Sequence, residues 1–172
     1  MNRVMIHVCS LARLHRTVEE TGARHVVTLL RDVHLVTRPA CVDLDKHLVL
    51  GMDDIPEPAD GYVAPGEDHV SRLIAFARTW DRTTPLVVHC YAGISRSTAA
   101  AFVTACALNP GRNELRIAQA LRQRSDTASP NRRIVSIADN LLGRNGRMMD
   151  AIQAIGLGTS AYEALPFQLE LE

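Results

Sequence analysis

Residues 85–97 read Pro-Leu-Val-Val-His-Cys-Tyr-Ala-Gly-Ile-Ser-Arg-Ser, and the rest of the chain is organised around them. The apolar run Leu86–Val88 predicts a buried parallel strand. The small residues that follow Arg96 predict a helix, with a tight loop around Gly93 between the two elements. A strand, a loop and a helix in this order direct backbone N–H groups and the positive end of a helix dipole toward an anion. The stretch therefore predicts an anion-binding loop.

The side chains of this loop indicate what happens to the anion. Cys90 is expected where several N–H dipoles converge, which favours the thiolate, the nucleophilic form of cysteine. Arg96 has a planar fork that can hold two oxygens of a phosphate. Ser97 can donate a hydrogen bond to the sulfur and stabilise it as a leaving group, and His89 is expected to orient the loop. The alternative is a buried cysteine that merely ends a core strand.

The pattern His89-Cys90-x5-Arg96-Ser97 resembles the signature of the cysteine-based protein tyrosine phosphatase superfamily. The wording Ala92-Gly93-x-Ser95-Arg96-Ser97 is most similar to the dual-specificity branch, closest to its bacterial members. The resemblance is strongest over residues 47–105. It implies a cysteinyl-phosphate intermediate and a catalytic set without metal or cofactor. It also implies that the phosphate is bound by a run of six residues, namely Tyr91, Ala92, Gly93, Ile94, Ser95 and Arg96.

A thiolate that attacks a phosphate ester needs a general acid near the leaving oxygen. In the family that this chain resembles, the acid is an aspartate on a mobile loop upstream of the nucleophile. The acidic loop, residues 53–61, is the acid-bearing stretch at a suitable distance from Cys90. We favour Asp54, because it follows the end of a predicted strand, while Asp53 and Asp60 stay open as alternatives. Trp-Pro-Asp, the wording of the phosphotyrosine-specific branch, does not occur here.

Hydrophobic periodicity predicts one α/β domain over residues 1–172, with a mostly parallel central sheet of about four strands flanked by helices. This architecture agrees with the protein tyrosine phosphatase-like fold that the resemblance implies. The expected strands are 4–8, 26–30, 47–50 and 86–88. The expected helices are 10–22, 66–80, 97–108, 112–124, 129–143 and 148–155. Ser129 is expected to cap the fifth helix, and the tail after residue 155 is expected to be irregular.

The composition of the chain limits the classes of binding partner that we expect. The 172 residues carry 19 basic and 19 acidic side chains, so no overall field favours nucleic acid or an anionic membrane. The four cysteines have no zinc spacing, and their sparse use indicates a reducing cytoplasm. No signal peptide is visible, and the longest apolar segment is too short to span a bilayer. The oligomeric state stays open.

The function predicted from these features is hydrolysis of phosphate monoesters, with phosphotyrosine and also phosphoserine or phosphothreonine of proteins as candidate substrates. One alternative is a phosphatase for a small or lipid phosphate such as an inositol phosphate, although the loop brings no lysine to a polyanion. Another is a non-catalytic phosphate-binding module, which the presence of both Cys90 and Arg96 disfavours. Eight arginines between residues 112 and 147 are either solvated, or Arg132 or Arg133 contacts an anionic substrate.

Overall fold

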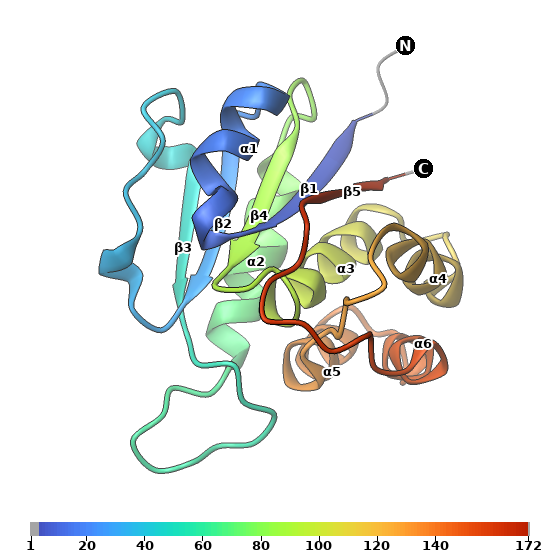
Figure 1. The fold of residues 1–172 in the computed structure, drawn as a ribbon. Coiled ribbons are helices and arrows are strands. Elements are labelled where there is room, and N and C mark those ends of the chain that lie inside the picture. Colours follow the sequence, from blue (N-terminus) through green and yellow to red (C-terminus); the bar gives the residue numbers. More distant parts are fainter. Residues whose placement is uncertain (1–3, 172) are drawn as a thin grey trace.

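Residues 4–171 are described by a computed structural model, and they form a five-stranded sheet in the order β3-β2-β4-β1-β5 (Figure 1). The strands are β1 Met5–Ser10, β2 His25–Leu30, β3 His47–Gly51, β4 Leu86–Cys90 and β5 Phe167–Glu170. The first four are parallel, and β5 runs antiparallel to β1 at the edge. The predicted mostly parallel α/β sheet is confirmed, and it has five strands where about four were expected, because the tail expected to be irregular supplies β5.

Six α-helices surround the sheet: α1 Leu14–Thr21, α2 Glu67–Thr79, α3 Arg96–Leu108, α4 Glu114–Arg124, α5 Arg132–Leu141 and α6 Arg147–Ile155. Short 3-10 turns occupy Leu11–Arg13, Val33–Leu35 and Leu44–Lys46. Helix α1 covers one face, where Leu14 and Val18 pack against Val26 and Val87. The other helices lie on the opposite side, grouped around α3 (Figure 1). Both faces are therefore covered, which explains why β2 and β4 are buried throughout.

Helix α3 is buried along almost its whole length, because its small side chains let neighbouring helices and the sheet approach closely. It follows β4 after five residues, and this connection, residues 91–95, is named the Cys90 loop. The register places Ser10 beside Cys90 and Cys9 beside His89. Since side chains alternate along a strand, Cys90 points to the α3 side and His89 to the α1 side. The first turn of α3 thus lies directly beneath the loop.

Helix α5 begins later than predicted. Ser129 does not cap it; the N-cap is Asn131, whose Oδ1 accepts a hydrogen bond from the backbone N–H of Ile134 at 3.1 Å. Gly22 does end α1 in the left-handed conformation, with φ of 68°. Within residues 4–171, no helix combines the length and the apolar character needed to cross a membrane.

Candidate active site

The Cys90 loop is held by hydrogen bonds to its carbonyl groups from outside the β4–α3 unit. Tyr91 O accepts from Leu11 N at 3.1 Å, Ala92 O from Ala164 N at 2.9 Å, Ile94 O from Ser129 N at 2.9 Å and Ser95 O from Asn131 N at 3.2 Å. In a trans peptide the N–H points opposite to the C=O. With the carbonyls engaged on the outside, the loop N–H groups face the inside of the loop, where an anion would sit.

Gly93 allows this loop to close against β1. Its φ is +75°, a conformation that side chains with a Cβ rarely adopt. A Cβ added there would lie 2.9 Å from the carbonyl carbon of Cys9 and 3.0 Å from Ser10 N. Both the backbone angle and the space therefore require glycine at this position.

Cys90 is only 2% exposed, and its Sγ contacts the loop and the first turn of α3. Ser97 Oγ is 3.1 Å from the sulfur, and the backbone N–H of Gly93 donates to it at 3.3 Å. The loop therefore donates one N–H to Sγ, and the Ser97 hydroxyl in the first turn of α3 lies within hydrogen-bond distance of the same atom. Hydrogen bonds of this kind stabilise a negative charge on sulfur.

Arg96 is held at the end of β3. Its Nη1 donates to the carbonyl of Met52 at 2.8 Å, and the residue is 9% exposed. Its Nε is buried and has no partner among residues 4–171. A buried donor without a partner costs free energy unless it meets an acceptor. The guanidinium is thus fixed on one side and has a free donor that fits an oxygen of a bound phosphate.

His89 is buried within the sheet and hydrogen-bonded on both ring nitrogens. Its Nε2 lies 2.7 Å from Thr28 Oγ1, which lies 2.8 Å from Nε2 of His47, and its Nδ1 lies 3.3 Å from the Cys90 carbonyl. Burial lowers the pKa of His89 to about 4, so the ring is neutral near pH 7. These contacts fit a residue that orients the Cys90 backbone.

The acidic loop reaches the Cys90 loop through Asp54. Asp54 Oδ1 accepts hydrogen bonds from Ser95 Oγ and from Asn131 Nδ2, both at 2.7 Å. Asp53 instead accepts from Val63 N at 2.6 Å and pairs with Arg31 at 3.3 Å, so it stabilises the acidic loop itself. Asp60 is exposed and has no hydrogen bond or ion pair within the described part of the chain. Of the three candidate acids, Asp54 is the one that contacts the Cys90 loop.

Asn131 joins three parts of the site and was missed by sequence reasoning. Its backbone N–H donates to Ser95 O, its Oδ1 caps α5 and its Nδ2 donates to Asp54. The sequence did contain a signal for this cap, because asparagine is a favoured N-cap residue and Asn131 stands directly before the first residue of α5. The prediction chose Ser129, which instead donates its backbone N–H to Ile94 O.

The other three cysteines differ from Cys90 in their surroundings. Burial raises the pKa of Cys9 and of Cys106 to about 12, which keeps both as thiols. Cys41 is exposed, and all four cysteines are free. Cys9 lies on the opposite face of the sheet from Cys90, so a bridge between them would require the sheet to rearrange.

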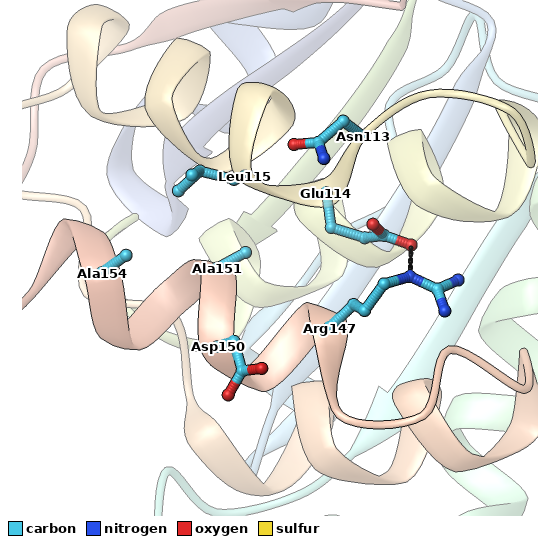
Figure 2. Close-up of a pocket in the computed structure, with 7 residues that line it drawn as sticks. All are labelled: Asn113, Glu114, Leu115, Arg147, Asp150, Ala151 and Ala154. Carbon is cyan, nitrogen blue, oxygen red and sulfur yellow. Dashed lines mark hydrogen bonds and ion pairs between the residues drawn. The ribbon is translucent and has the colours of Figure 1, made fainter.

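A pocket of about 290 Å³ between α4 and α6 is distinct from this site (Figure 2). Figure 2 shows Glu114 turned toward Arg147. The Glu114 carboxylate lies 3.2 Å from Arg147 Nε and 2.7 Å from Nη1 of the buried Arg144. Arg144 donates in addition to the carbonyl of Cys106 at 2.7 Å. These ion pairs are satisfied within the protein and connect α4, α3 and the start of α6. Within residues 4–171, no group of three or more His, Cys, Asp or Glu side chains could hold a metal ion.

Comparison with known proteins gives a family-model match over part of the chain and a similarity in fold. Residues 58–127, which contain Cys90 and Arg96, match the family model described as Protein-tyrosine phosphatase. No curated protein matches the chain. Among solved structures, the PTP-2 phosphatase of Cydia pomonella aligns with a TM-score of 0.61 and 18% identity, over 78% of this chain and 84% of that chain.

Two further structures align over most of their length. Human DUSP28 has a TM-score of 0.62 and 17% identity, over 81% of this chain and 89% of that chain. PTPMT1 in complex with PI(5)P has a TM-score of 0.61 and 16% identity, over 87% of this chain and 92% of that chain. These similarities confirm the predicted fold.

Proposed function

We propose that this chain, whose residues 58–127 match the protein-tyrosine phosphatase family model, hydrolyses phosphate monoesters of proteins by way of a cysteinyl-phosphate intermediate. Phosphotyrosine is the proposed main substrate, with phosphoserine and phosphothreonine as candidates of the dual-specificity type. The observation that supports this most is the set of donors around one sulfur. Ser97 Oγ and the Gly93 N–H lie within 3.3 Å of Cys90 Sγ, and α3 also supplies the unpartnered Nε of Arg96.

In the first step, Cys90 Sγ attacks phosphorus in line with the ester oxygen. The S–P bond forms while the P–O ester bond breaks, and the electron pair of that bond leaves with the oxygen. Asp54 in its protonated form gives its proton to this oxygen. Arg96 Nε and the inward-facing N–H groups of the Cys90 loop stabilise the equatorial oxygens.

In the second step, water attacks the phosphorus of the cysteinyl-phosphate. Asp54, now a carboxylate, takes a proton from the water, and the S–P bond breaks. Ser97 Oγ, 3.1 Å from the sulfur, donates a hydrogen bond to the departing thiolate. Inorganic phosphate leaves, and Asp54 and Cys90 return to their starting protonation states.

A small or lipid phosphate is the second candidate substrate. Its support is the similarity in fold to PTPMT1, which was solved in complex with PI(5)P. Against it, residues 91–95 carry no lysine or arginine, so the rim of the loop brings no charge to a ligand with several phosphates. We therefore place it after the protein substrate.

The test is turnover of p-nitrophenyl phosphate and of a phosphotyrosine peptide by the purified chain and by Cys90→Ser. We expect the variant to lose at least about 10³-fold in kcat while it still binds phosphate analogues, because a serine hydroxyl is not ionised by the same dipoles. Iodoacetamide at about pH 6 should label Cys90 first, and phosphate should protect it. Turnover by Cys90→Ser, or faster labelling of the exposed Cys41, would contradict the proposal.

A further inference from the structure

A pocket of about 290 Å³ beside the acidic loop has no role in the mechanism above. Its walls come from the acidic loop, from the first turns of α5 and from α6. The lining residues are Pro56, Glu57, Arg132, Arg133, Ser136, Ile137 and Met149. The pocket thus combines two guanidinium groups, one carboxylate, one hydroxyl and three apolar side chains.

Two walls of the pocket contain residues that lie close in sequence to the proposed general acid or to its hydrogen-bond partner. Pro56 lies two residues after Asp54, and Arg132 follows Asn131, whose amide donates to Asp54 at 2.7 Å. In the proposed mechanism, the leaving oxygen of the substrate meets Asp54. A group attached to the leaving oxygen can therefore extend from Asp54 toward this pocket.

The two arginines of the pocket differ in their hydrogen bonds. Arg133 Nε donates to the carbonyl of Pro65 at 2.6 Å, so it connects α5 to the segment before α2. Arg132 is exposed, and within residues 4–171 its guanidinium has neither a hydrogen bond nor an ion pair. Glu57 is likewise exposed and unpaired within the described residues, so it does not neutralise Arg132 by direct contact.

We propose that this pocket is a subsite for a second anionic group of the substrate, held by the Arg132 guanidinium. The ligand chemistry is a phosphate or carboxylate attached to the leaving group, and the planar fork of arginine suits both. Ile137 and Met149 offer apolar surface to the chain between the two charges. The inference rests on the proposed function, since it names the class of substrate: a phosphomonoester with a second negative charge.

The experiment compares three probes: an acidic phosphotyrosine peptide, its neutral counterpart with glutamines, and an inositol bisphosphate, each relative to p-nitrophenyl phosphate. The preference for an anionic probe is its kcat/KM divided by that for p-nitrophenyl phosphate. We expect Arg132→Ala to lower this preference about tenfold and Arg132→Lys to lower it less, since lysine keeps the charge but not the fork. Glu57→Gln should raise it, because a like charge is removed. Arg116→Ala, at an exposed position on α4, is the matched control.

The acidic peptide and the inositol bisphosphate distinguish the source of the second anion. The source is the probe for which Arg132→Ala lowers the preference more. The subsite is overturned if Arg132→Ala and Arg116→Ala show the same preference for the anionic probes. It is also overturned if Glu57→Gln shows a lower preference than the wild type. Calorimetry on Cys90→Ser and on Cys90→Ser/Arg132→Ala gives the affinity for the acidic peptide relative to the neutral one, which measures the contribution of Arg132 without turnover. Failure of the proposed function therefore shows as absent hydrolysis of every probe, and failure of the subsite as an unchanged ratio.

Discussion

The carboxylate of Asp54 receives both of its described hydrogen bonds on one oxygen. Ser95 and Asn131 donate to Oδ1, and Oδ2 has no partner among residues 4–171. Donors at Oδ1 favour its role as an acceptor, so the proton of the acid form belongs on Oδ2. We therefore expect Oδ2 to be the oxygen that exchanges a proton with the leaving group and with water.

Asp54→Asn should lower kcat in a way that depends on the leaving group. We expect a loss of about 10²–10⁴-fold for an alkyl phosphate, whose alkoxide leaves poorly, and a much smaller loss for an activated aryl phosphate. The measurement is a leaving-group series at fixed pH. Asp60→Asn should behave like the wild type. Asp53→Asn should affect all substrates alike, because Asp53 stabilises the acidic loop through Val63 and Arg31. Leaving-group dependence in either control would move the general acid to that residue.

Asn131→Ser separates two roles of one side chain. Serine is a good N-cap, so α5 should keep most of its stability, but its short hydroxyl cannot replace the amide that donates to Asp54. We expect the free energy of unfolding to change by no more than about 1 kcal/mol. In the same leaving-group series, kcat for the alkyl phosphate should fall about tenfold more than for the aryl phosphate. An equal loss on both substrates would show that Asn131 acts only through the helix.

Arg96→Lys should lose on the order of 2–4 kcal/mol of transition-state stabilisation, read from kcat/KM. The arginine fork donates to Met52 O through Nη1 and keeps Nε for the phosphate, whereas one ammonium group cannot occupy both positions. Circular dichroism on the same samples verifies that the fold is retained. A variant close to wild type in kcat/KM would mean that the phosphate binds elsewhere.

Among the elements, β4, the Cys90 loop and α3 were predictable because each has a local signal. The apolar run, the glycine at positive φ and the small helical residues act within a few positions of one another. Strand β5 had no such signal: Phe167–Glu170 is short, and its pairing partner β1 lies at the other end of the chain. The supports of the Cys90 loop escaped prediction for a related reason, since Leu11, Ser129 and Ala164 act through backbone N–H groups that any residue except proline carries.

The segment between α6 and β5 runs past the start of α3 on its way to the sheet edge (Figure 1), and its backbone contacts the Cys90 loop. Gly158 N donates to Ser129 Oγ at 2.9 Å, Thr159 N to Asp126 O at 2.8 Å and Ala164 N to Ala92 O at 2.9 Å. Ser10 Oγ also donates to Glu163 at 2.6 Å. This segment therefore connects the Cys90 loop, β1 and the turn before α5.

Gly158→Ala should loosen this segment. A Cβ there would lie 2.5 Å from the carbonyl carbon of Thr127 and 2.6 Å from Asp126 O, and backbone atoms cannot move aside as a flexible side chain can. We expect a loss of about 1–3 kcal/mol in the free energy of unfolding, together with a lower kcat/KM. Urea unfolding and p-nitrophenyl phosphate turnover measure the two effects. Gly111→Ala is the control, because nothing lies within 4 Å of its added Cβ. Equal stability of the two variants would contradict this account of the segment.

At the scale of the whole molecule, the sheet buries a row of hydrogen-bonded polar side chains that leads from β3 to the residue before the nucleophile. His47, Thr28 and His89 are linked at 2.8 and 2.7 Å, and His89 stands directly before Cys90. The Thr28 hydroxyl has a single proton, so it donates to one ring and accepts from the other. The Cys90 carbonyl can only accept, so Nδ1 of His89 donates to it and Nε2 accepts from Thr28. Protonation of His89 would place a buried positive charge among these side chains and remove the acceptor on Nε2. The neutral His89 ring therefore contributes both to the stability of the fold and to the position of the Cys90 backbone.

This dependence predicts that acid destabilises the protein. Burial lowers the pKa of His89 to about 4, while the unfolded chain has the ordinary value near 6.5. Between these two values the unfolded state binds the proton and the folded state does not, so stability rises with pH and is lost as pH falls from about 6.5 to 4. From about pH 7 to pH 5, His89 should contribute a loss of roughly 2 kcal/mol. Burial also lowers the pKa of His47, which acts in the same direction.

Urea unfolding at about pH 7 and at about pH 5 tests the prediction. We expect His89→Gln to be less stable than the wild type at neutral pH but to lose distinctly less of its stability on acidification, because glutamine has no proton to gain. His34→Gln, at an exposed position in the 3-10 turn Val33–Leu35, should keep the wild-type difference. If His89→Gln and the wild type lose the same amount, the acid sensitivity belongs to other groups. The neutral buried ring would then not be what makes folding depend on pH.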